Sequence, residues 1–191
     1  MSHVEEALKV YERLDDRANQ AQCLMDLAQL LHSDKQLSGA EEAATRAMGL
    51  LSKDEEFLLS QCHRFLGHIS RSRREREKAM HHYETALAIA SASHWINEQF
   101  WIHHSLATLF LDDSEFDDAT THLKQARQCV ADDKYCLGRA MQIQAQIWYQ
   151  QGKHGDAKLE VSCAIDVFEK LGAAKELDNC RGFLQRELAE Q

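Results

Sequence analysis

Proline is absent from this chain of 191 residues, and glycine occurs only eight times, although proteins average about 5% proline and about 7% glycine. Proline ends a helix because it lacks the amide donor and clashes with the preceding turn. Alternating runs of β-branched residues are also missing, so that no segment is a candidate strand. These absences predict an all-α protein whose helices end only at their turns.

Long apolar segments are missing as well. No stretch of 18 apolar residues occurs, which argues against a membrane partner, and the N-terminal residues have neither the basic nor the apolar region of a signal peptide. The six cysteines include no Cys-X-X-Cys pair, and we expect reduced thiols in a cytoplasmic protein. They are Cys23, Cys62, Cys129, Cys136, Cys163 and Cys180.

Basic charge is in deficit, since 22 lysines and arginines face 31 acidic residues and give a net charge of −9. This balance argues against nucleic acid as a partner, because phosphate binding requires a basic surface. The sequence contains no phosphate-binding loop and no His-Glu-X-X-His motif. The pairs His81–His82 and His103–His104 are adjacent, so their side chains diverge by about 100° on a helix. The sequence therefore predicts no enzyme, no cofactor and no metal site.

What the chain does contain is a spacing that occurs four times. Each copy has a small residue on a first helix, followed 12, 16 and 19 residues later by further positions on a second helix. The small residue advances by 39, 40 and 38 from copy to copy, and a period of this length is typical of stacked helical repeats. The copies are Ala28, Ala40, Ala44 and Ala47; Gly67, Ala79, Tyr83 and Ala86; Ala107, Ala119, Leu123 and Ala126; and Ala145, Ala157, Val161 and Ala164.

The apolar spacing of three and four predicts helices along the whole chain. Their ranges are 3–14, 18–33, 36–52, 55–72, 75–92, 96–111, 115–131, 134–151, 154–171 and 174–189. We expect 1–17 to carry the second helix of a truncated repeat, 173–191 to carry a capping helix, and four repeats to span 18–54, 55–95, 96–133 and 134–172. The turn at Arg71–Glu75 has no glycine and is expected from the repeat register alone. The small residues should lie where paired helices cross, because closely approaching backbones leave room only for glycine or alanine.

This register resembles the tetratricopeptide repeat (TPR), whose consensus is matched best by the second copy, Leu66-Gly67, Ala79, Tyr83 and Ala86. The consensus proline is absent, and the period of 38–40 is longer than that of the usual repeat. Longer repeats of this kind are similar to those of kinesin light chains and of the sensor arrays of signal-transduction NTPases. The resemblance implies a right-handed superhelical solenoid of antiparallel helix pairs.

A second resemblance concerns four segments, Phe100–Ala107, Phe116–Ala119, Leu137–Met141 and Val167–Lys175. They look like the C-terminal TPR arrays of fungal NB-ARC proteins, which are relatives of NOD-like receptors within the STAND class. That likeness implies a non-catalytic region that senses a protein or peptide ligand. Residues 7–14 also match residues 164–171 in the fourth repeat, which suggests a fragment or short relative of a longer array.

In TPR arrays the first helix of each pair lines the concave face, and this implies a partner-binding groove. Its centre is basic and aromatic although the chain is acidic, so we expect an acidic protein or peptide segment as partner. The arginines would bind carboxylates and the aromatic rings would anchor an apolar side chain; alternatively, these residues form a solvated inner wall. The groove residues are Gln22, Met25, Gln29, Arg64, His68, Arg71, Trp101, His104, Thr108, Arg139, Gln142, Gln146 and Tyr149.

A different function is also compatible with the sequence. Val4, Leu8 and Tyr11 lie on a terminal helix without its partner helix, and exposed apolar faces form contacts. The chain would then be an oligomerisation or scaffold element, with a homodimer formed through this N-terminal helix.

Overall fold

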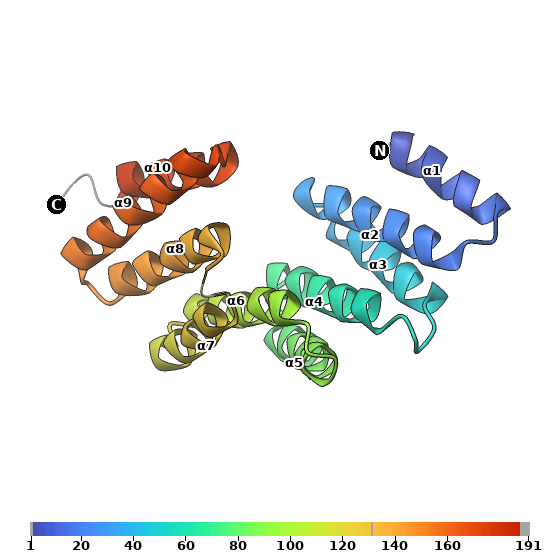
Figure 1. Cartoon of the computed structure of the whole chain (residues 1–191), viewed down its shortest axis with the longest axis horizontal. Helices are drawn as coiled ribbons and strands as arrows, with labels where there is room; N and C mark the ends of the chain where they lie inside the picture. The colour runs from blue at the N-terminus through green and yellow to red at the C-terminus, as the bar shows by residue number, and fades with distance from the viewer. Residues whose placement is uncertain (1, 131, 188–191) are drawn as a thin grey trace. The chain divides into compact units, whose positions relative to one another are not determined.

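The computed structural model describes residues 2–130 and 132–187, and this part of the chain consists of helices joined by short turns (Figure 1). Its ten helices are α1 Ser2–Arg13, α2 Arg17–Ser33, α3 Leu37–Leu50, α4 Glu56–Ser72, α5 Arg76–Ala92, α6 Ile96–Asp112, α7 Phe116–Cys129, α8 Lys134–Gln150, α9 His154–Leu171 and α10 Ala174–Glu187. The predicted ranges are confirmed to within two residues, except where 131, 188 and 189 lie outside the described residues. No strand occurs among the described residues, as predicted.

The chain divides into two compact units, Met1–Glu98 and Gln99–Gln191, and the boundary falls inside α6. In the first unit α2 packs on α3, α4 packs on α5, and α3 joins these pairs by packing on α4. In the second unit α8 packs on α9, α7 packs on α8, and α10 packs on α9. The paired helices are antiparallel because the turns between them are short (Figure 1). Each unit is thus built from stacked helix pairs, as the repeat spacing predicts.

Among the described residues, one type of turn joins successive helices seven times. A residue with positive φ follows the helix end, and the next amide donates to the carbonyl five residues earlier, which is the Schellman arrangement. In the turn without glycine, Arg74 adopts φ 61° and the Glu75 amide donates to the Ser70 carbonyl over 2.9 Å. The predicted turn at Arg71–Glu75 is therefore confirmed. The positive-φ residues are Asp15, Lys35, Arg74, His94, Ser114, Gly152 and Gly172.

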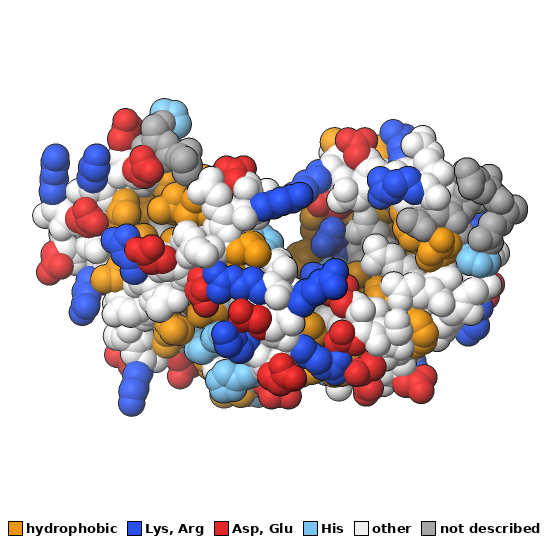
Figure 2. All heavy atoms as spheres, turned by 180° about the vertical axis from the view of Figure 1, so that it is seen from behind, with side chains coloured by type: hydrophobic (Ala, Val, Ile, Leu, Met, Phe, Trp, Pro, Cys, Tyr) orange, Lys and Arg blue, Asp and Glu red, His pale blue; other side chains and the backbone are white. Residues whose placement is uncertain are grey.

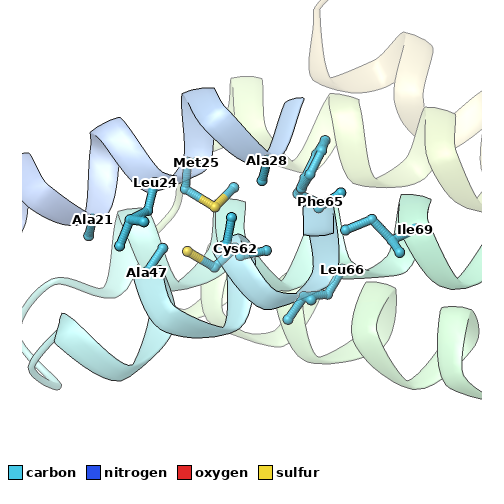
Figure 3. Close-up of a cluster of buried hydrophobic side chains, with 12 residues drawn as sticks. Ala21, Leu24, Met25, Ala28, Ala47, Cys62, Phe65, Leu66 and Ile69 are labelled. Carbon is cyan, nitrogen blue, oxygen red and sulfur yellow. The ribbon is translucent and has the colours of Figure 1, made fainter. Parts of the chain in front are cut away.

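The small residues of the repeat spacing lie at the centres of the helix pairs. All twelve are buried, as the predicted register requires: Ala28, Ala40, Ala47, Gly67, Ala79, Ala86, Ala107, Ala119, Ala126, Ala145, Ala157 and Ala164. Large side chains fill the remaining space, and Figure 3 shows this for the cluster formed by α2, α3 and α4. The closest approach is at Gly67, where an added Cβ would lie 2.4 Å from the Tyr83 ring.

The N-terminal helix differs from the expectation of an exposed apolar face. Helix α1 packs on α2, Leu8 contacts the core cluster, and Val4 and Tyr11 are half-buried. The carbonyl of Tyr11 also accepts a 3.0 Å hydrogen bond from the Gln20 side chain. Helix α1 thus packs on α2, as α3 packs on α4.

The described cysteines are all free thiols, and only Cys163 among them is exposed. Within residues 2–130 and 132–187, no helix combines the length and apolar character needed to cross a membrane.

Candidate partner-binding surface

The thirteen predicted groove residues all lie on the first helices of pairs. Six belong to α2 and α4 in the first unit, and seven belong to α6 and α8 in the second.

Residues at one repeat position contact the next helix pair or α10 in three of the four copies. This position is occupied by Met25, Arg64, His104 and Gln142 in successive copies. Met25 is buried in the cluster that includes Cys62 and Phe65 of α4, and Figure 3 shows its side chain within that cluster. Met25 therefore packs between repeats and offers little surface to a ligand.

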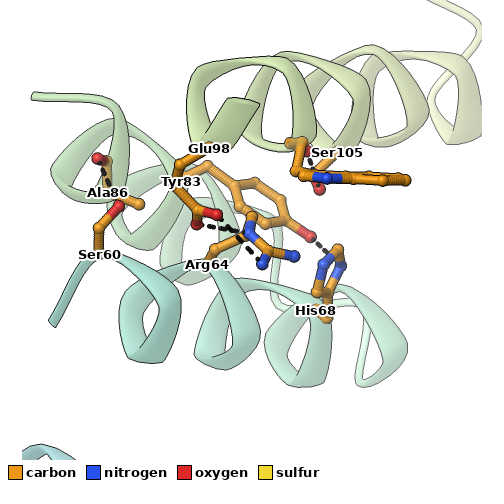
Figure 4. Close-up of polar contacts among 8 residues, drawn as sticks. Ser60, Arg64, His68, Tyr83, Ala86, Glu98 and Ser105 are labelled. Carbon is orange, nitrogen blue, oxygen red and sulfur yellow. Dashed lines mark hydrogen bonds and ion pairs between the residues drawn. The ribbon is translucent and has the colours of Figure 1, made fainter. Parts of the chain in front are cut away.

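Arg64 occupies the same position in the second copy. Its Nε donates to Oε1 of Glu98 over 2.7 Å, and Nη2 approaches Oε2 at 3.4 Å (Figure 4). The Glu98 side chain is buried, with 4% of its residue surface exposed. A buried carboxylate requires a paired cation because desolvation is otherwise costly. The charge of Arg64 is thus already neutralised within the fold.

In the fourth copy, the side-chain amide of Gln142 is likewise used in contacts within the fold. Its Nε2 donates to the carbonyl of Glu176 at 3.3 Å and contacts Sγ of Cys180 at 3.0 Å, both on α10. His104, at this position in the third copy, is buried among the rings of Phe100 and Trp101. In the first, second and fourth copies, the position predicted to line a groove is thus a contact between successive helical units.

The remaining residues of the first unit are more accessible. Gln22 and Gln29 are exposed, and the Gln22 amide donates to Asp26 one turn later over 3.0 Å. His68 and Arg71 are half-buried. The His68 Nδ1 lies 3.0 Å from the hydroxyl of buried Tyr83, as Figure 4 shows. This face of α2 and α4 is polar and partly solvated.

Arg71 has an electrostatic effect on a neighbouring ring. Burial lowers the pKa of His32, and the charge of Arg71 lowers it further. The His32 Nε2 lies 2.9 Å from the hydroxyl of Ser72, which links α2 to α4. At neutral pH this end of the face therefore carries the arginine charge beside a neutral histidine.

In the second unit, Trp101 is half-buried on α6. Its ring contacts Phe100 and His104 edge-on, with centroids 4.9 and 5.9 Å away, and lies 6.3 Å from Tyr135 of α8. Thr108 donates its hydroxyl to the His104 carbonyl over 2.7 Å. The hydroxyl proton of Thr108 is thus used within its own helix, whereas part of the Trp101 surface remains accessible.

Arg139 on α8 has one side-chain nitrogen without a hydrogen-bond partner in the described part of the chain. Its Nη1 donates weakly to Oε1 of Gln142 at 3.3 Å, whereas its Nε is buried and has no hydrogen-bond partner among the described residues. Burial raises the pKa of the neighbouring Tyr135 hydroxyl, and the charge of Arg139 opposes that rise. The Tyr135 hydroxyl donates to Glu176 over 2.9 Å. The cation of Arg139 and the aromatic ring of Tyr135 therefore lie next to each other.

The far end of α8 is contacted by α10. The Tyr149 ring packs edge-on against Phe183 of α10 at 5.6 Å and against His154 at 5.1 Å. Gln146 is half-buried on the same helix. Tyr149 thus contributes to the packing of the last described helix, and only part of its ring is accessible.

The expected concentration of positive charge is reduced by these contacts. Arg64 is paired with Glu98, and Nη1 of Arg139 donates to the side-chain amide of Gln142. On the face shown in Figure 2, acidic and basic side chains are interspersed. A partner would therefore meet single arginines within a mixed surface.

Two histidine pairs were missed by the sequence analysis, which considered only neighbours along one helix. His63 of α4 faces His82 of α5 with their Nδ1 atoms 3.2 Å apart, and His103 of α6 faces His122 of α7 at 3.1 Å. Both pairs have a separation of 19 residues. Recurrence of this spacing in successive copies was the available signal.

Comparisons with known proteins give a fold and no family. No family model matches the chain, and no curated protein matches it. Among solved structures, aspartyl phosphate phosphatase F from Bacillus subtilis superposes with a TM-score of 0.81 and 19% identity, covering 98% of this chain and 50% of the other. BtubC (BKLC) from P. vanneervenii superposes with a TM-score of 0.73 and 16% identity, covering 97% of this chain and 88% of the other.

The chain has a TPR-like helical-repeat fold. At identities of 19% and 16% the likeness concerns the fold alone. The chain spans about half the length of the phosphatase that it resembles.

Proposed function

We propose that this chain is a non-catalytic module that binds a protein or peptide segment, with Arg139 as the anchor for a carboxylate of that segment. The observation that carries the proposal is the buried Nε of Arg139, which has no hydrogen-bond partner among the described residues. Because this nitrogen has no accessible surface, the guanidinium would turn outward on binding, and a carboxylate would then bind Nε and one Nη in the bidentate geometry that arginine favours.

Neighbouring side chains support a peptide rather than a free anion as ligand. The Tyr135 ring beside Arg139 also contacts Trp101, with centroids 6.3 Å apart. Tyrosine, tryptophan and arginine are the residues enriched among those that dominate protein interfaces. An acidic residue of the partner would bind Arg139, and an adjacent apolar side chain would pack against the accessible part of Trp101.

The wider setting that we propose rests on the sequence. The resemblance to fungal NB-ARC proteins supports a role as the ligand-sensing repeat region of a STAND-type signalling protein. The free state of the six cysteines supports a reducing compartment such as the cytoplasm, where thiols stay reduced.

Assembly through α1 is a second candidate function. Val10 and Leu14 on and just after this helix are 51% and 68% exposed. Two chains would bury these side chains by pairing, which would make the protein a scaffold element. Light scattering over a range of concentrations tests this candidate, because a monomer at every concentration would contradict it.

The binding proposal is tested by capturing partners from the source cells with the full chain and mapping the bound segment. We expect Arg139→Gln to weaken binding of that segment roughly 10-fold to 100-fold, since a charged hydrogen bond contributes about 1.5–3 kcal/mol. Arg127→Gln is the matched control, because Glu160 already binds the Arg127 guanidinium at 2.8 Å. Equal affinity of the wild type and Arg139→Gln would refute the assigned anchor.

Catalysis is tested separately. Because one structural neighbour is named an aspartyl phosphate phosphatase, hydrolysis of a protein aspartyl phosphate is the relevant assay. Turnover by the full chain would contradict a non-catalytic role.

A further inference from the structure

The two histidine pairs occupy the same place in successive repeats. His63 and His103 lie on first helices, His82 and His122 lie on the second helices packed against them, and each member is 40 residues from its counterpart. The Nδ1 atoms face each other at 3.2 Å in one pair and at 3.1 Å in the other. Two imidazole nitrogens thus converge across a helix pair in each unit.

The imidazole rings are arranged to be neutral near pH 7. Burial lowers the pKa of all four rings, and for His103 it does so to about 4, with a further contribution from His122. In each pair one Nδ1 carries a proton that it donates, and the other presents a lone pair. Neutral imidazole is also the form that binds metal ions.

The separation of the nitrogens suits a tetrahedral metal ion. Zinc–imidazole bonds are about 2.0–2.1 Å long, so two of them at the tetrahedral angle hold their nitrogens about 3.3 Å apart. The observed separations of 3.2 and 3.1 Å are close to this distance. A small rotation of the rings would direct both lone pairs at one ion.

We propose that each histidine pair binds one divalent transition-metal ion, with Zn²⁺ as the representative ion, and so joins the two helices of its repeat. On binding, the Nδ1 proton of the donor ring moves to Nε2 through water, and both Nδ1 lone pairs bind the ion. One water leaves the ion's hydration shell for each nitrogen. In the described part of the chain no group of three or more histidine, cysteine or acidic side chains surrounds one point, so water completes the coordination.

The surrounding charges make the two sites unequal. The carboxylate of Asp118 lies near His122, and Gln125 hydrogen-bonds to the same ring. Such an outer hydrogen bond orients a metal-binding imidazole. At the other pair, burial, His63, His81 and Lys78 lower the pKa of His82, whereas the Glu41 carboxylate, which is already paired with Arg73, raises it. The pair His103–His122 should therefore bind the cation more tightly than His63–His82 does.

Calorimetric titration of the full chain with Zn²⁺ tests the proposal. We expect one ion for each pair and a melting temperature that rises with zinc concentration, because an ion bound only by the folded chain stabilises it. His122→Phe should abolish the tighter site and His82→Phe the weaker one, and the double variant should bind at neither. Phenylalanine retains the ring that stacks on Phe110 beside His122 and removes both nitrogens.

Two measurements keep the outcome independent of any folding defect. The exposed histidine His94 provides a matched control, since His94→Ala should leave the stoichiometry unchanged. In the wild type, Zn²⁺ should shift the ¹⁵N resonances of Nδ1 in all four paired rings. Absence of zinc binding, binding unaffected by His122→Phe and His82→Phe, or unshifted Nδ1 resonances would each overturn the proposal.

Discussion

Substitution of Gly67 by alanine would place a methyl group where the structure leaves no space for it. The added Cβ would lie 2.4 Å from Cε1 and 2.6 Å from Cδ1 of Tyr83. The Tyr83 ring is completely buried, and its hydroxyl lies 3.0 Å from Nδ1 of His68. The ring therefore cannot move aside cheaply.

The expected effect is a difference between two opposing contributions. Alanine favours a helix over glycine by about 1 kcal/mol, whereas overpacking a filled core costs about 1–3 kcal/mol. With backbone and ring this close, the upper end applies, and we expect a net loss of about 2 kcal/mol in the free energy of unfolding. For a chain of this size, that loss lowers the melting temperature by roughly 4–8 °C.

Thermal and urea unfolding monitored by circular dichroism measure the effect against a control. Gly49 in α3 has no atom within 4 Å of an added Cβ, so Gly49→Ala should stabilise the protein, by up to about 1 kcal/mol. The third repeat pairs Ala107 with Leu123 at the equivalent positions, so Gly67→Ala combined with Tyr83→Leu should recover part of the loss. A Gly67→Ala variant as stable as Gly49→Ala would refute the reasoning.

Three further predictions follow from the burial of charged and titratable groups. Arg64→Ala should destabilise the first unit by about 3 kcal/mol because buried Glu98 loses its cation. Arg181→Ala, which breaks a half-exposed pair with Glu169, should cost less than about 1 kcal/mol. Equal urea midpoints for the two variants would contradict this prediction. A maleimide at pH 8 should label exposed Cys163 first and Cys62 and Cys136 last, since burial raises the pKa of those two thiols to about 12. Equal labelling rates for all three cysteines would count against this prediction. With a chelator present, stability should fall as the pH drops from 7.5 to 5.5, because unfolded His103 binds a proton near its ordinary pKa of 6.5 whereas folded His103 does so only near pKa 4; urea midpoints should show a shallower pH slope for His103→Phe.

The helices and their register could be predicted because the deciding information is local. A helix boundary depends on a few neighbouring residues, and the Schellman turns need only one residue able to adopt positive φ. The register of the small residues could be predicted because the same offsets occur in four copies. Even the turn at Arg74, which has no glycine, followed from that periodicity.

The candidate site was predictable only in part. The sequence placed the thirteen groove residues on first helices, and the structure shows Gln22, Gln29, Trp101 and Arg139 with accessible surface or an unused donor. It could not distinguish the position of Arg64, which faces the next repeat, from those that face solvent. Whether Arg64 is available depends on Glu98, a residue 34 positions away.

The amino-acid sequence by itself determined that this protein is a row of helix pairs with alanine-sized residues at their crossings, because those features depend on spacing along the chain. Only the tertiary structure decided which side chains meet across helices. It buried Met25, neutralised Arg64 with Glu98, and brought His103 to His122. Such contacts depend on how one helix rotates and packs against another, and the distances that govern them are set by the packed core.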